Sequence, residues 1–384
     1  MVKTIGIIGG GQLGRMMIPA IKQLGMRAAV LDPAPDCPCA SMCDRLIVAG
    51  FNDEAGFFEL AKISDVITYE FEHINTALLK KLQQAGHKIF PSVDSLSIIQ
   101  DKFTQKQALR GAGIAVPDFE AVKGVDQLAL RFTKTQRAFM LKSRRGGYDG
   151  YGNHVVRSIK DIAAAFQKFD KISDNMELMA EPIVQFEKEV SVIATRGQDG
   201  KTVVYPIAEN VHKNSILDVT TVPASISEKT RLLVIETAKK VMECFDGVGT
   251  FCTELFVNET TGEVLVNEVA PRVHNSGHYT INACCVSQFE NHIRAIAGLP
   301  AGKTDMHCEA AAMKNVLGEP GHDGAAEFTG VEEALALNGV SVHIYGKANT
   351  KPGRKMGHVN LIGTPQEIKA NLAKINVKAV AEKT

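Results

Sequence analysis

The chain of 384 residues is long enough for two or three domains, each with a sizeable core. Its 45% hydrophobic and 22% charged residues are typical of a soluble globular protein, and 43 basic against 43 acidic side chains leave no net charge to attract nucleic acid or a membrane surface. No apolar run approaches the roughly 20 residues of a membrane span, and the start of the chain lacks the pattern of a signal peptide. We therefore expect a cytoplasmic protein whose eight cysteines are reduced.

A glycine-rich turn follows the first predicted strand. Residues 2–8 are an apolar run, residues 9–14 match G-x-G-x-x-G, and the next strand ends at Asp32, 18 positions after Gly14. Taken alone, this βαβ unit suggests a dinucleotide-binding oxidoreductase. The same turn can hold any phosphate at a helix N-terminus, however, and no second βαβ series follows downstream.

Further strands and helices alternate up to about residue 90. Strands are expected near 45–48, 65–70 and 88–90, with helices near 52–63 and 76–85. Residues 68–73 lie at the C-terminal end of a strand, where open α/β sheets bind ligands. Ordinary capping by polar groups would explain this stretch equally well.

A second region begins near residue 100 with a helix that carries Lys102. A predicted strand at 139–142 ends in Lys142, and the loop 143–153 has four glycines and two arginines. A strand, a lysine and a glycine-rich loop together predict a mobile lid whose backbone N–H groups bind nucleotide phosphates, although no G-K-[ST] follows. A flexible surface hairpin is the alternative.

The remaining elements surround two polar clusters. Helices are expected at 161–169, 227–245 and 281–297, and strands at 177–184, 186–195, 203–207, 340–345 and 357–362. Between the last two strands, residues 347–355 contain four basic side chains around Pro352 and Gly353. They form either a local anion site or a solvated turn.

The other cluster belongs to a predicted hairpin, residues 249–269. Folding it about Thr261 places Glu254 opposite Glu268, where repulsion at about 5 Å and an effective dielectric of about 20 costs roughly 3 kcal/mol. A divalent cation would reverse this repulsion, and oxygen ligands suit Mg²⁺. Five polar residues follow Glu268 and predict an anion pocket beside the metal: Arg272, His274, Asn275, Ser276 and His278.

Four motifs together resemble one family. They are Gly-Gly-Gly-Gln-Leu-Gly-Arg-Met at 9–16, Gly-Gly-Tyr-Asp-Gly-Tyr-Gly at 146–152, Asn-Glu-Val-Ala-Pro-Arg-Val-His-Asn-Ser-Gly-His at 267–278, and Pro-Gly-Arg-Lys-Met-Gly-His at 352–358. Together with Lys102 and Lys142 they are similar to those of the 5-(carboxyamino)imidazole ribonucleotide synthases, ligases of the ATP-grasp superfamily. The resemblance covers essentially the whole chain.

The resemblance implies an α/β fold in three parts: a Rossmann-like, biotin-carboxylase-like substrate domain at 1–100, an ATP-grasp nucleotide-binding domain at 101–300 and a small C-terminal domain at 301–384. It implies that ATP, bicarbonate and aminoimidazole ribonucleotide give the carbamate, ADP and phosphate through carboxyphosphate, in purine biosynthesis. Mg²⁺, a homodimer and delivery of product to the mutase of the same pathway are also implied.

The resemblance also assigns roles by position. Glu254 and Glu268 would bind Mg²⁺. Arg272, His274 and Asn275 would hold bicarbonate and carboxyphosphate, with His274 a candidate base, and Lys347 would complete the catalytic group. ATP would contact Lys102, Lys142, Gly147, Tyr148, Asp149, Gly150, Tyr151, Gly152, Asn153, Glu181, Pro182, Ile183, Val184, Glu189, His212, Asn267 and Glu268. The ribonucleotide would contact Gln12, Leu13, Glu70, Tyr148, Asp149, Lys347, Arg354 and Lys355.

Two positions depart from the family pattern. Lys102 stands where many relatives have arginine, and Ala270 stands where many ATP-grasp enzymes have a third metal ligand, asparagine. Another ATP-grasp ligase, such as a formate-using glycinamide ribonucleotide transformylase or a biotin carboxylase, would share the nucleotide half. The motifs at 272–278 and 352–355 favour the carboxylating purine enzyme.

Overall fold

The computed structural model describes residues 2–147, 152–170 and 177–381. The predicted ligand residues Tyr148, Asp149, Gly150 and Tyr151 therefore lie outside the described part. Within that part, every helix is too short or too polar to cross a membrane.

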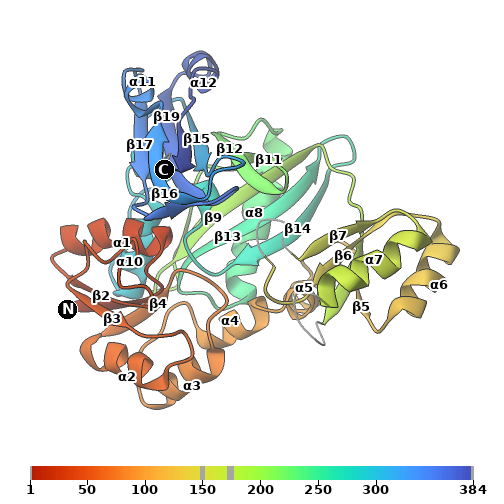
Figure 1. The fold of residues 1–384 in the computed structure, drawn as a ribbon, viewed down its shortest axis with the longest axis horizontal. Helices are drawn as coiled ribbons and strands as arrows, with labels where there is room; N and C mark the ends of the chain where they lie inside the picture. The colour runs from red at the N-terminus through yellow and green to blue at the C-terminus, as the bar shows by residue number, and fades with distance from the viewer. Residues whose placement is uncertain (1, 148–151, 171–176, 382–384) are drawn as a thin grey trace.

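The N-terminal unit is a parallel sheet in the order β3-β2-β1-β4 with helices on both faces (Figure 1). Its strands are β1 (Thr4–Ile8), β2 (Arg27–Asp32), β3 (Arg45–Val48) and β4 (Val66–Tyr69), and its helices are α1 (Gln12–Gln23), α2 (Glu54–Ile63) and α3 (Thr76–Gln84). The strand expected at 88–90 is reduced to a single bridge between Ile67 and Ile89. Pro91, which lacks an N–H, follows directly and cannot extend the ladder.

The next region carries the smaller antiparallel sheet, β5-β8-β6-β7, at the right of Figure 1. Two helices lead into it, α4 (Val93–Ile99) and α5 (Lys102–Gly111). The elements of this lid unit are β5 (Glu120–Val122), α6 (Val125–Thr135), β6 (Phe139–Ser143), β7 (Asn153–Val156), α7 (Ile159–Asp170) and β8 (Leu178–Pro182). The predicted strand at 139–142 is confirmed as β6, which runs one residue past Lys142 to Ser143 before the glycine-rich loop.

A large antiparallel sheet forms the centre of the molecule. Its strands run in the order β14-β13-β9-β11-β12-β15-β19-β17, with β10 paired to β9. The first members and their helix are β9 (Lys188–Arg196), β10 (Thr202–Val204), β11 (Ala208–Lys213), β12 (Ile216–Val222), α8 (Glu228–Cys244), β13 (Gly249–Asn258) and β14 (Glu263–Ala270). Val234, Ala238 and Val241 of α8 pack against apolar side chains of this sheet, as its amphipathic pattern predicts.

The C-terminal segment extends the same sheet. Its elements are η1 (Asn275–Gly277), α9 (Thr280–Ala283), α10 (Gln288–Ile296), β15 (Ala310–Leu317), β16 (Gly324–Thr329), α11 (Val331–Leu335), β17 (Val340–Ile344), β18 (Asn349–Thr350), β19 (Lys355–Gly363), α12 (Pro365–Leu372) and β20 (Lys378–Ala381). β15, β19 and β17 join the large sheet, and β18, β16 and β20 form a three-stranded one. The domain limits at 100 and 300 stay predictions.

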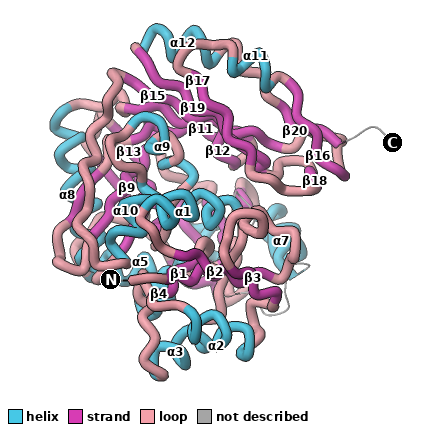
Figure 2. The backbone as a smooth tube through the Cα atoms, turned by 90° about the vertical axis from the view of Figure 1, so that its left-hand side faces the viewer, coloured by secondary structure: helices cyan, strands magenta, loops and turns pink. Residues whose placement is uncertain are grey.

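The single helix expected at 281–297 is wrong, because two helices occupy this stretch. Ser287 is the N-cap of α10, and its side chain accepts a hydrogen bond from the Glu290 amide. An N-cap residue has a non-helical backbone, so α9 and α10 are separate helices. Figure 2 shows α10 beside α1, and Met17 and Ile21 share a buried core with Phe289 and Ile293. This packing joins the N-terminal unit to the large sheet.

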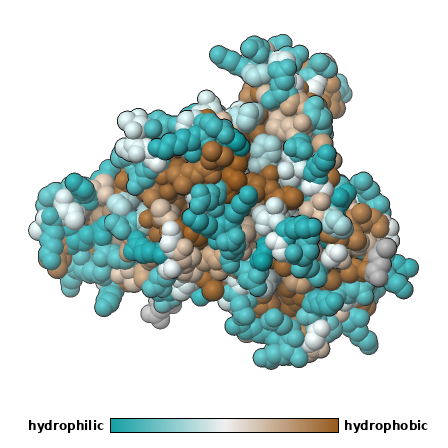
Figure 3. All heavy atoms as spheres, turned by 180° about the vertical axis from the view of Figure 1, so that it is seen from behind, coloured by the Kyte–Doolittle hydropathy of each residue, from teal (hydrophilic) through white to brown (hydrophobic). Residues whose placement is uncertain are grey.

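The surface opposite to that of Figure 1 is mixed in polarity. Apolar side chains gather near its centre, and hydrophilic side chains cover most of its outer parts (Figure 3).

Asp101 connects the start of α5 to the lid unit. Its buried carboxylate accepts from the amides of Phe103 and Thr104 and pairs with the Arg144 guanidinium at 2.5 Å. We expect Asp101→Ala to lower the free energy of unfolding by about 3–5 kcal/mol, since it removes a helix cap and the buried ionic partner of Arg144, which keeps only the exposed carboxylate of Glu177. Asp53→Ala is the matched control: Asp53 caps α2 from an exposed position, so its loss should cost about 1 kcal/mol in the same denaturant titration. Equal losses in the two variants would contradict a stabilising role for the Asp101–Arg144 pair.

Candidate functional site

A cavity of about 1060 Å³ lies where the N-terminal unit, the lid unit and the large sheet meet. Most of the site residues predicted from sequence line it: Gln12, Leu13, Glu70, Lys102, Lys142, Gly147, Asn153, Glu189, His212, Glu254, Asn267, Glu268, Arg272, His274, Asn275, Lys347, Arg354 and Lys355. The structure therefore brings together residues from the first 15 and the last 40 positions of the chain, as well as from its centre.

The acidic pair belongs to the hairpin β13–β14. Glu254 and Glu268 are directly opposite, which confirms the predicted pairing. The reason differs from the one expected, however, because Asn258 pairs with Glu263 rather than with Val264. A β-bulge at Asn267 shifts the register by one residue between Leu255 and Glu254 and so brings Glu268 opposite Glu254.

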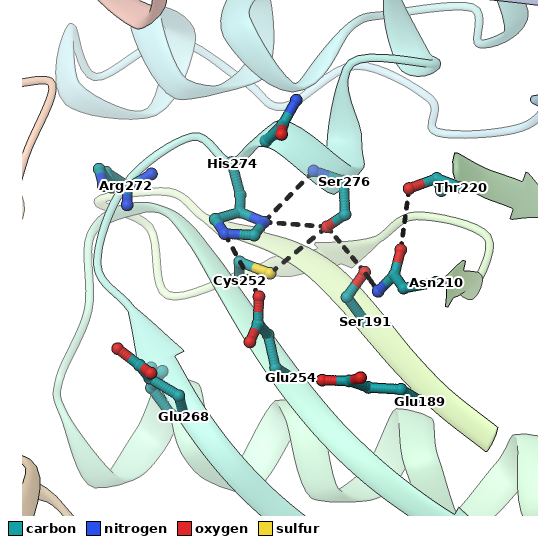
Figure 4. Close-up of polar contacts among 12 residues, drawn as sticks. Glu189, Ser191, Asn210, Thr220, Cys252, Glu254, Glu268, Arg272, His274 and Ser276 are labelled. Atoms are coloured by element: carbon teal, nitrogen blue, oxygen red, sulfur yellow. Dashed lines mark hydrogen bonds and ion pairs between the residues drawn. The ribbon is translucent and has the colours of Figure 1, made fainter. Parts of the chain in front are cut away.

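The two carboxylates have different electrostatic environments. Burial, together with the negative charges of Glu268 and Glu189, raises the pKa of Glu254 to about 7. Burial would also raise the pKa of Glu268, but the Lys102 ammonium at 2.5 Å outweighs it and holds that pKa below its usual value. Figure 4 shows the carboxylates of Glu189, Glu254 and Glu268 gathered in one region. Their oxygens and mutual repulsion fit a hard cation such as Mg²⁺.

A cluster of lysines lies beside these carboxylates, and sequence analysis missed one member. Glu181 is only 2% exposed, and its carboxylate pairs with Lys142 Nζ at 2.7 Å and Lys106 Nζ at 3.1 Å. Burial lowers the pKa of Lys106 to about 8, even though Glu181 opposes that shift. The signal was available, because Lys106 follows Lys102 by one helical turn and shares its face.

The predicted ATP contacts at 181–184 stay a prediction. The Glu181 carboxylate forms ion pairs with two lysines and does not line the cavity. Pro182, Ile183 and Val184 are half-buried and do not line it either. Gly152, at φ +84°, lies next to Ser143 at the base of the loop. Glu189 pairs with His212 at 3.0 Å. Burial alone would lower the pKa of His212, but the negative charges of Glu189 and Glu254 have the larger effect, so the pKa of His212 is raised.

The anion pocket predicted after Glu268 is formed only in part. Half-buried Arg272 and His274 and buried Asn275 line the cavity, whereas Ser276 and His278 are buried behind its wall. Arg272 Nη2 pairs with Glu72 Oε1 at 2.8 Å, and its Nη1 donates to the Val273 carbonyl. Its buried Nε has no hydrogen-bond partner among the described residues. Glu72 belongs to the candidate ligand-binding stretch 68–73, but its pairing with Arg272 was not predicted, because 200 positions separate the two residues. A guanidinium with an unused donor beside a cavity suits an oxyanion.

His274 and Asn275 are held in place by their neighbours. His274 Nε2 lies 3.4 Å from Glu254 Oε1, and burial with the nearby positive charge of Arg272 lowers the pKa of His274 well below its usual value. Asn275 exchanges two hydrogen bonds with Asn315, at 3.0 and 2.8 Å. Both side chains therefore have defined orientations at the cavity wall.

The glycine-rich turn of the N-terminal unit is already occupied by carboxylates. The amides of Gly11 and Gly14 donate to Glu70, and the amide of Gly10 donates to Asp32 at 2.8 Å. A dinucleotide pyrophosphate would need these same donors. This geometry argues against the oxidoreductase alternative and puts Glu70 at the cavity wall, as expected.

The basic turn of the C-terminal segment reaches the opposite wall of the cavity. Lys347 Nζ donates to the Lys355 carbonyl at 2.7 Å, and Arg354 Nη1 donates to the Asn349 carbonyl at 2.5 Å. Lys347, Arg354 and Lys355 therefore form a basic wall facing the N-terminal glycine turn.

Comparisons with known proteins agree with this arrangement. Three family models match in order: the ribonucleotide synthetase preATP-grasp domain at residues 2–100, the ATP-grasp domain at 107–289 and the phosphoribosylaminoimidazole carboxylase C-terminal domain at 311–371. The fold and the lysine–carboxylate site define an ATP-grasp ligase.

Relatives of high similarity give the particular family. The chain is 42% identical to the N5-carboxyaminoimidazole ribonucleotide synthase of Brucella melitensis over 94% of this chain and 96% of that protein. The crystal structure of the Thermotoga maritima synthetase aligns with a TM-score of 0.87 at 42% identity, covering 99% of this chain and 100% of that one. The Aspergillus clavatus synthase, solved with ADP and 5-aminoimidazole ribonucleotide, has a TM-score of 0.87 at 32% identity, with 97% and 98% covered. The chain belongs to the family of N5-carboxyaminoimidazole ribonucleotide synthases.

Proposed function

We propose that this protein uses ATP to carboxylate 5-aminoimidazole ribonucleotide with bicarbonate, through carboxyphosphate, giving 5-(carboxyamino)imidazole ribonucleotide, ADP and phosphate. The observation that carries the proposal is one cavity that holds the acidic pair, the Arg272–His274 pocket and the basic turn. The ligands in the structure of the Aspergillus clavatus synthase, ADP and 5-aminoimidazole ribonucleotide, agree with this assignment.

The ATP phosphates are assigned to the lysine side of the cavity. Lys102 and Lys142 supply positive charge, and the ion pair with the buried carboxylate of Glu181 fixes the position of Lys142. Bicarbonate is a poor electrophile, and phosphorylation gives it a leaving group. Negative charge that develops on the transferring phosphoryl group would be stabilised by Lys142 and by the cation between Glu254 and Glu268. When bound, Mg²⁺ would neutralise charge on the phosphate oxygens of ATP.

Bicarbonate and carboxyphosphate are assigned to the pocket beside Glu254. The guanidinium of Arg272 and the imidazole of His274 both belong to the cavity wall here. Carboxyphosphate hydrolyses readily, so the site must also exclude water, which is the role we assign to the loop after Lys142.

The ribonucleotide phosphate is assigned to the basic turn. Lys347→Ala and Arg354→Ala should each raise the KM for the ribonucleotide about tenfold or more, because each removes a charge-assisted phosphate contact. The KM for ATP should change little. Lys351→Ala is the control, since this exposed lysine of the same turn does not line the cavity. A rise confined to the KM for ATP would move the turn to the nucleotide site.

The direct test of the reaction is an ATPase assay with the ribonucleotide and bicarbonate added singly and together. Full ADP release should need both, with carbamate formed in proportion. A formate-dependent or biotin-dependent ADP release would favour another ATP-grasp ligase.

Three further assignments rest on the family resemblance. We propose a homodimer, delivery of the carbamate to the mutase of the same pathway, and a cytoplasmic location. The apolar area at the centre of Figure 3 is a surface that a second copy could cover. Sedimentation analysis of the purified chain would test the dimer.

A further inference from the structure

A chain of buried hydrogen bonds crosses the floor of the site and ends on His274 (Figure 4). Thr220 Oγ1 donates to Asn210 Oδ1 at 2.8 Å, and Asn210 Nδ2 donates to Ser191 Oγ at 3.0 Å. Ser191 Oγ donates to Ser276 Oγ at 2.7 Å, and Ser276 Oγ lies 2.9 Å from His274 Nδ1. We call these four residues, Thr220, Asn210, Ser191 and Ser276, the relay.

The relay is placed by the large sheet. Three of its members come from the adjacent strands β12, β11 and β9, and Ser276 lies in η1 just above them. Thr220, Ser191 and Ser276 are 0% exposed and Asn210 is 7% exposed. Buried polar groups are costly unless they are hydrogen-bonded, and apolar side chains would pack at such positions without that requirement. Packing alone therefore does not account for four linked polar residues beneath one histidine.

The relay ends on a ring nitrogen that can only accept. The backbone amide of Ser276 also points at His274 Nδ1, at 3.3 Å. A backbone N–H is always a donor, so Nδ1 must be unprotonated and the neutral ring must carry its proton on Nε2. The relay supplies a hydroxyl donor to the same atom, because Ser276 accepts from Ser191 and has its own proton left to donate.

We infer that the Ser276 amide and the relay together fix His274 as the Nε2–H tautomer, so that the ring presents a hydrogen-bond donor to the cavity and not a base. Nε2 faces the Glu254 carboxylate at 3.4 Å. An oxyanion bound there would receive this N–H, which stabilises negative charge as it develops. The identity of that oxyanion as bicarbonate or carboxyphosphate rests on the proposed function, whereas the tautomer does not.

The same geometry argues against a transition-metal site. Ligand atoms of Cys252, Glu254 and His274 lie within 4.8 Å of one another, a set that zinc could use. A metal on Nε2 would require the proton on Nδ1, facing an acceptor. Nδ1 instead faces the Ser276 amide, a donor.

The tautomer can be measured directly in the full-length protein with ¹⁵N-labelled histidine. Two-bond ¹H–¹⁵N correlations distinguish the two neutral tautomers, and the signals of His274 are assigned by their absence in His274→Gln. The wild-type protein should show the Nε2–H pattern for His274 without any ligand. The Nδ1–H pattern would overturn the inference.

Two variants test the contribution of the relay. Ser276→Ala removes the last hydroxyl but keeps the backbone amide, and Asn210→Asp keeps the shape but replaces the donor to Ser191 with an acceptor. Both should weaken the preference for the Nε2–H tautomer without abolishing it, because the Ser276 amide remains, and should lower kcat about 10- to 100-fold, by analogy with the hydrogen-bond partners that orient metal-binding histidines. KM values for ATP and the ribonucleotide should stay near those of the wild type.

The matched control is Thr195→Val. Thr195 shares strand β9 with Ser191, is 0% exposed and bonds only to Thr250 Oγ1 among the side chains, at 2.7 Å. It should change neither the tautomer nor kcat. Wild-type kcat in both relay variants would overturn the catalytic part of the inference. A wild-type protein with the Nε2–H pattern but no carboxylation would contradict the proposed function and leave the tautomer assignment standing.

Discussion

Glu268→Gln should lower kcat at least about a hundredfold while the fold survives. The carboxylate of Glu268 is held opposite Glu254, and Lys102 keeps its pKa low, so it carries a full negative charge toward the cavity. An uncharged amide would be a weaker ligand for Mg²⁺. It would also remove the partner of the Lys102 ammonium.

Activity alone would not separate a metal ligand from another catalytic carboxylate. The second measurement is therefore binding of ATP at increasing Mg²⁺ concentration, in which Glu268→Gln should require more Mg²⁺ for half-saturation. Glu263→Gln is the matched control, since Glu263 is exposed on the same strand. Wild-type turnover of Glu268→Gln at limiting Mg²⁺ would contradict the assignment of Glu268 as a Mg²⁺ ligand.

The sequence predicted this pair correctly but by an incomplete argument. A hairpin has few possible registers, so glutamates seven positions on either side of Thr261 were expected to face one another. The actual turn is set one residue differently, and the bulge at Asn267 corrects the offset. Bulges depend on local backbone contacts with neighbouring strands, and no residue type in 249–269 predicts one.

Contacts between residues far apart in the sequence were the other part of the site that could not be predicted. The lysine and glycine motifs are local in sequence, so Lys102, Lys142 and the residues after Glu268 could be assigned to the site. Glu72, which pairs with Arg272, lies just after β4, and the relay beneath His274 comes from β12, β11, β9 and η1, so only the three-dimensional fold brings these residues to the site. A serine or threonine inside an alternating strand carries no local sign that its hydroxyl takes part in a network.

Arg272→Ala should lower the rate of carbamate formation about a hundredfold, a loss of roughly 3 kcal/mol. Its guanidinium is oriented by Glu72 at 2.8 Å and by the Val273 carbonyl, and the remaining Nε–H has no partner among the described residues. An anion in the pocket would supply that partner. Binding of ATP and of the ribonucleotide should change much less, because their assigned contacts lie on other walls of the cavity.

The half-reaction is resolved by measuring phosphate release and carbamate formation separately. If both rates fall together, Arg272 acts during phosphorylation of bicarbonate. If phosphate release persists while carbamate is lost, carboxyphosphate forms and escapes, and Arg272 acts by retaining it. Arg294→Ala is a suitable control, since this arginine pairs with Glu290 on α10 and does not line the cavity. Near wild-type carbamate formation by Arg272→Ala at low bicarbonate would place the anion pocket elsewhere. Glu72→Gln should then separate charge from orientation: it keeps Arg272 but removes its ionic partner, so it should lower the rate less than Arg272→Ala does.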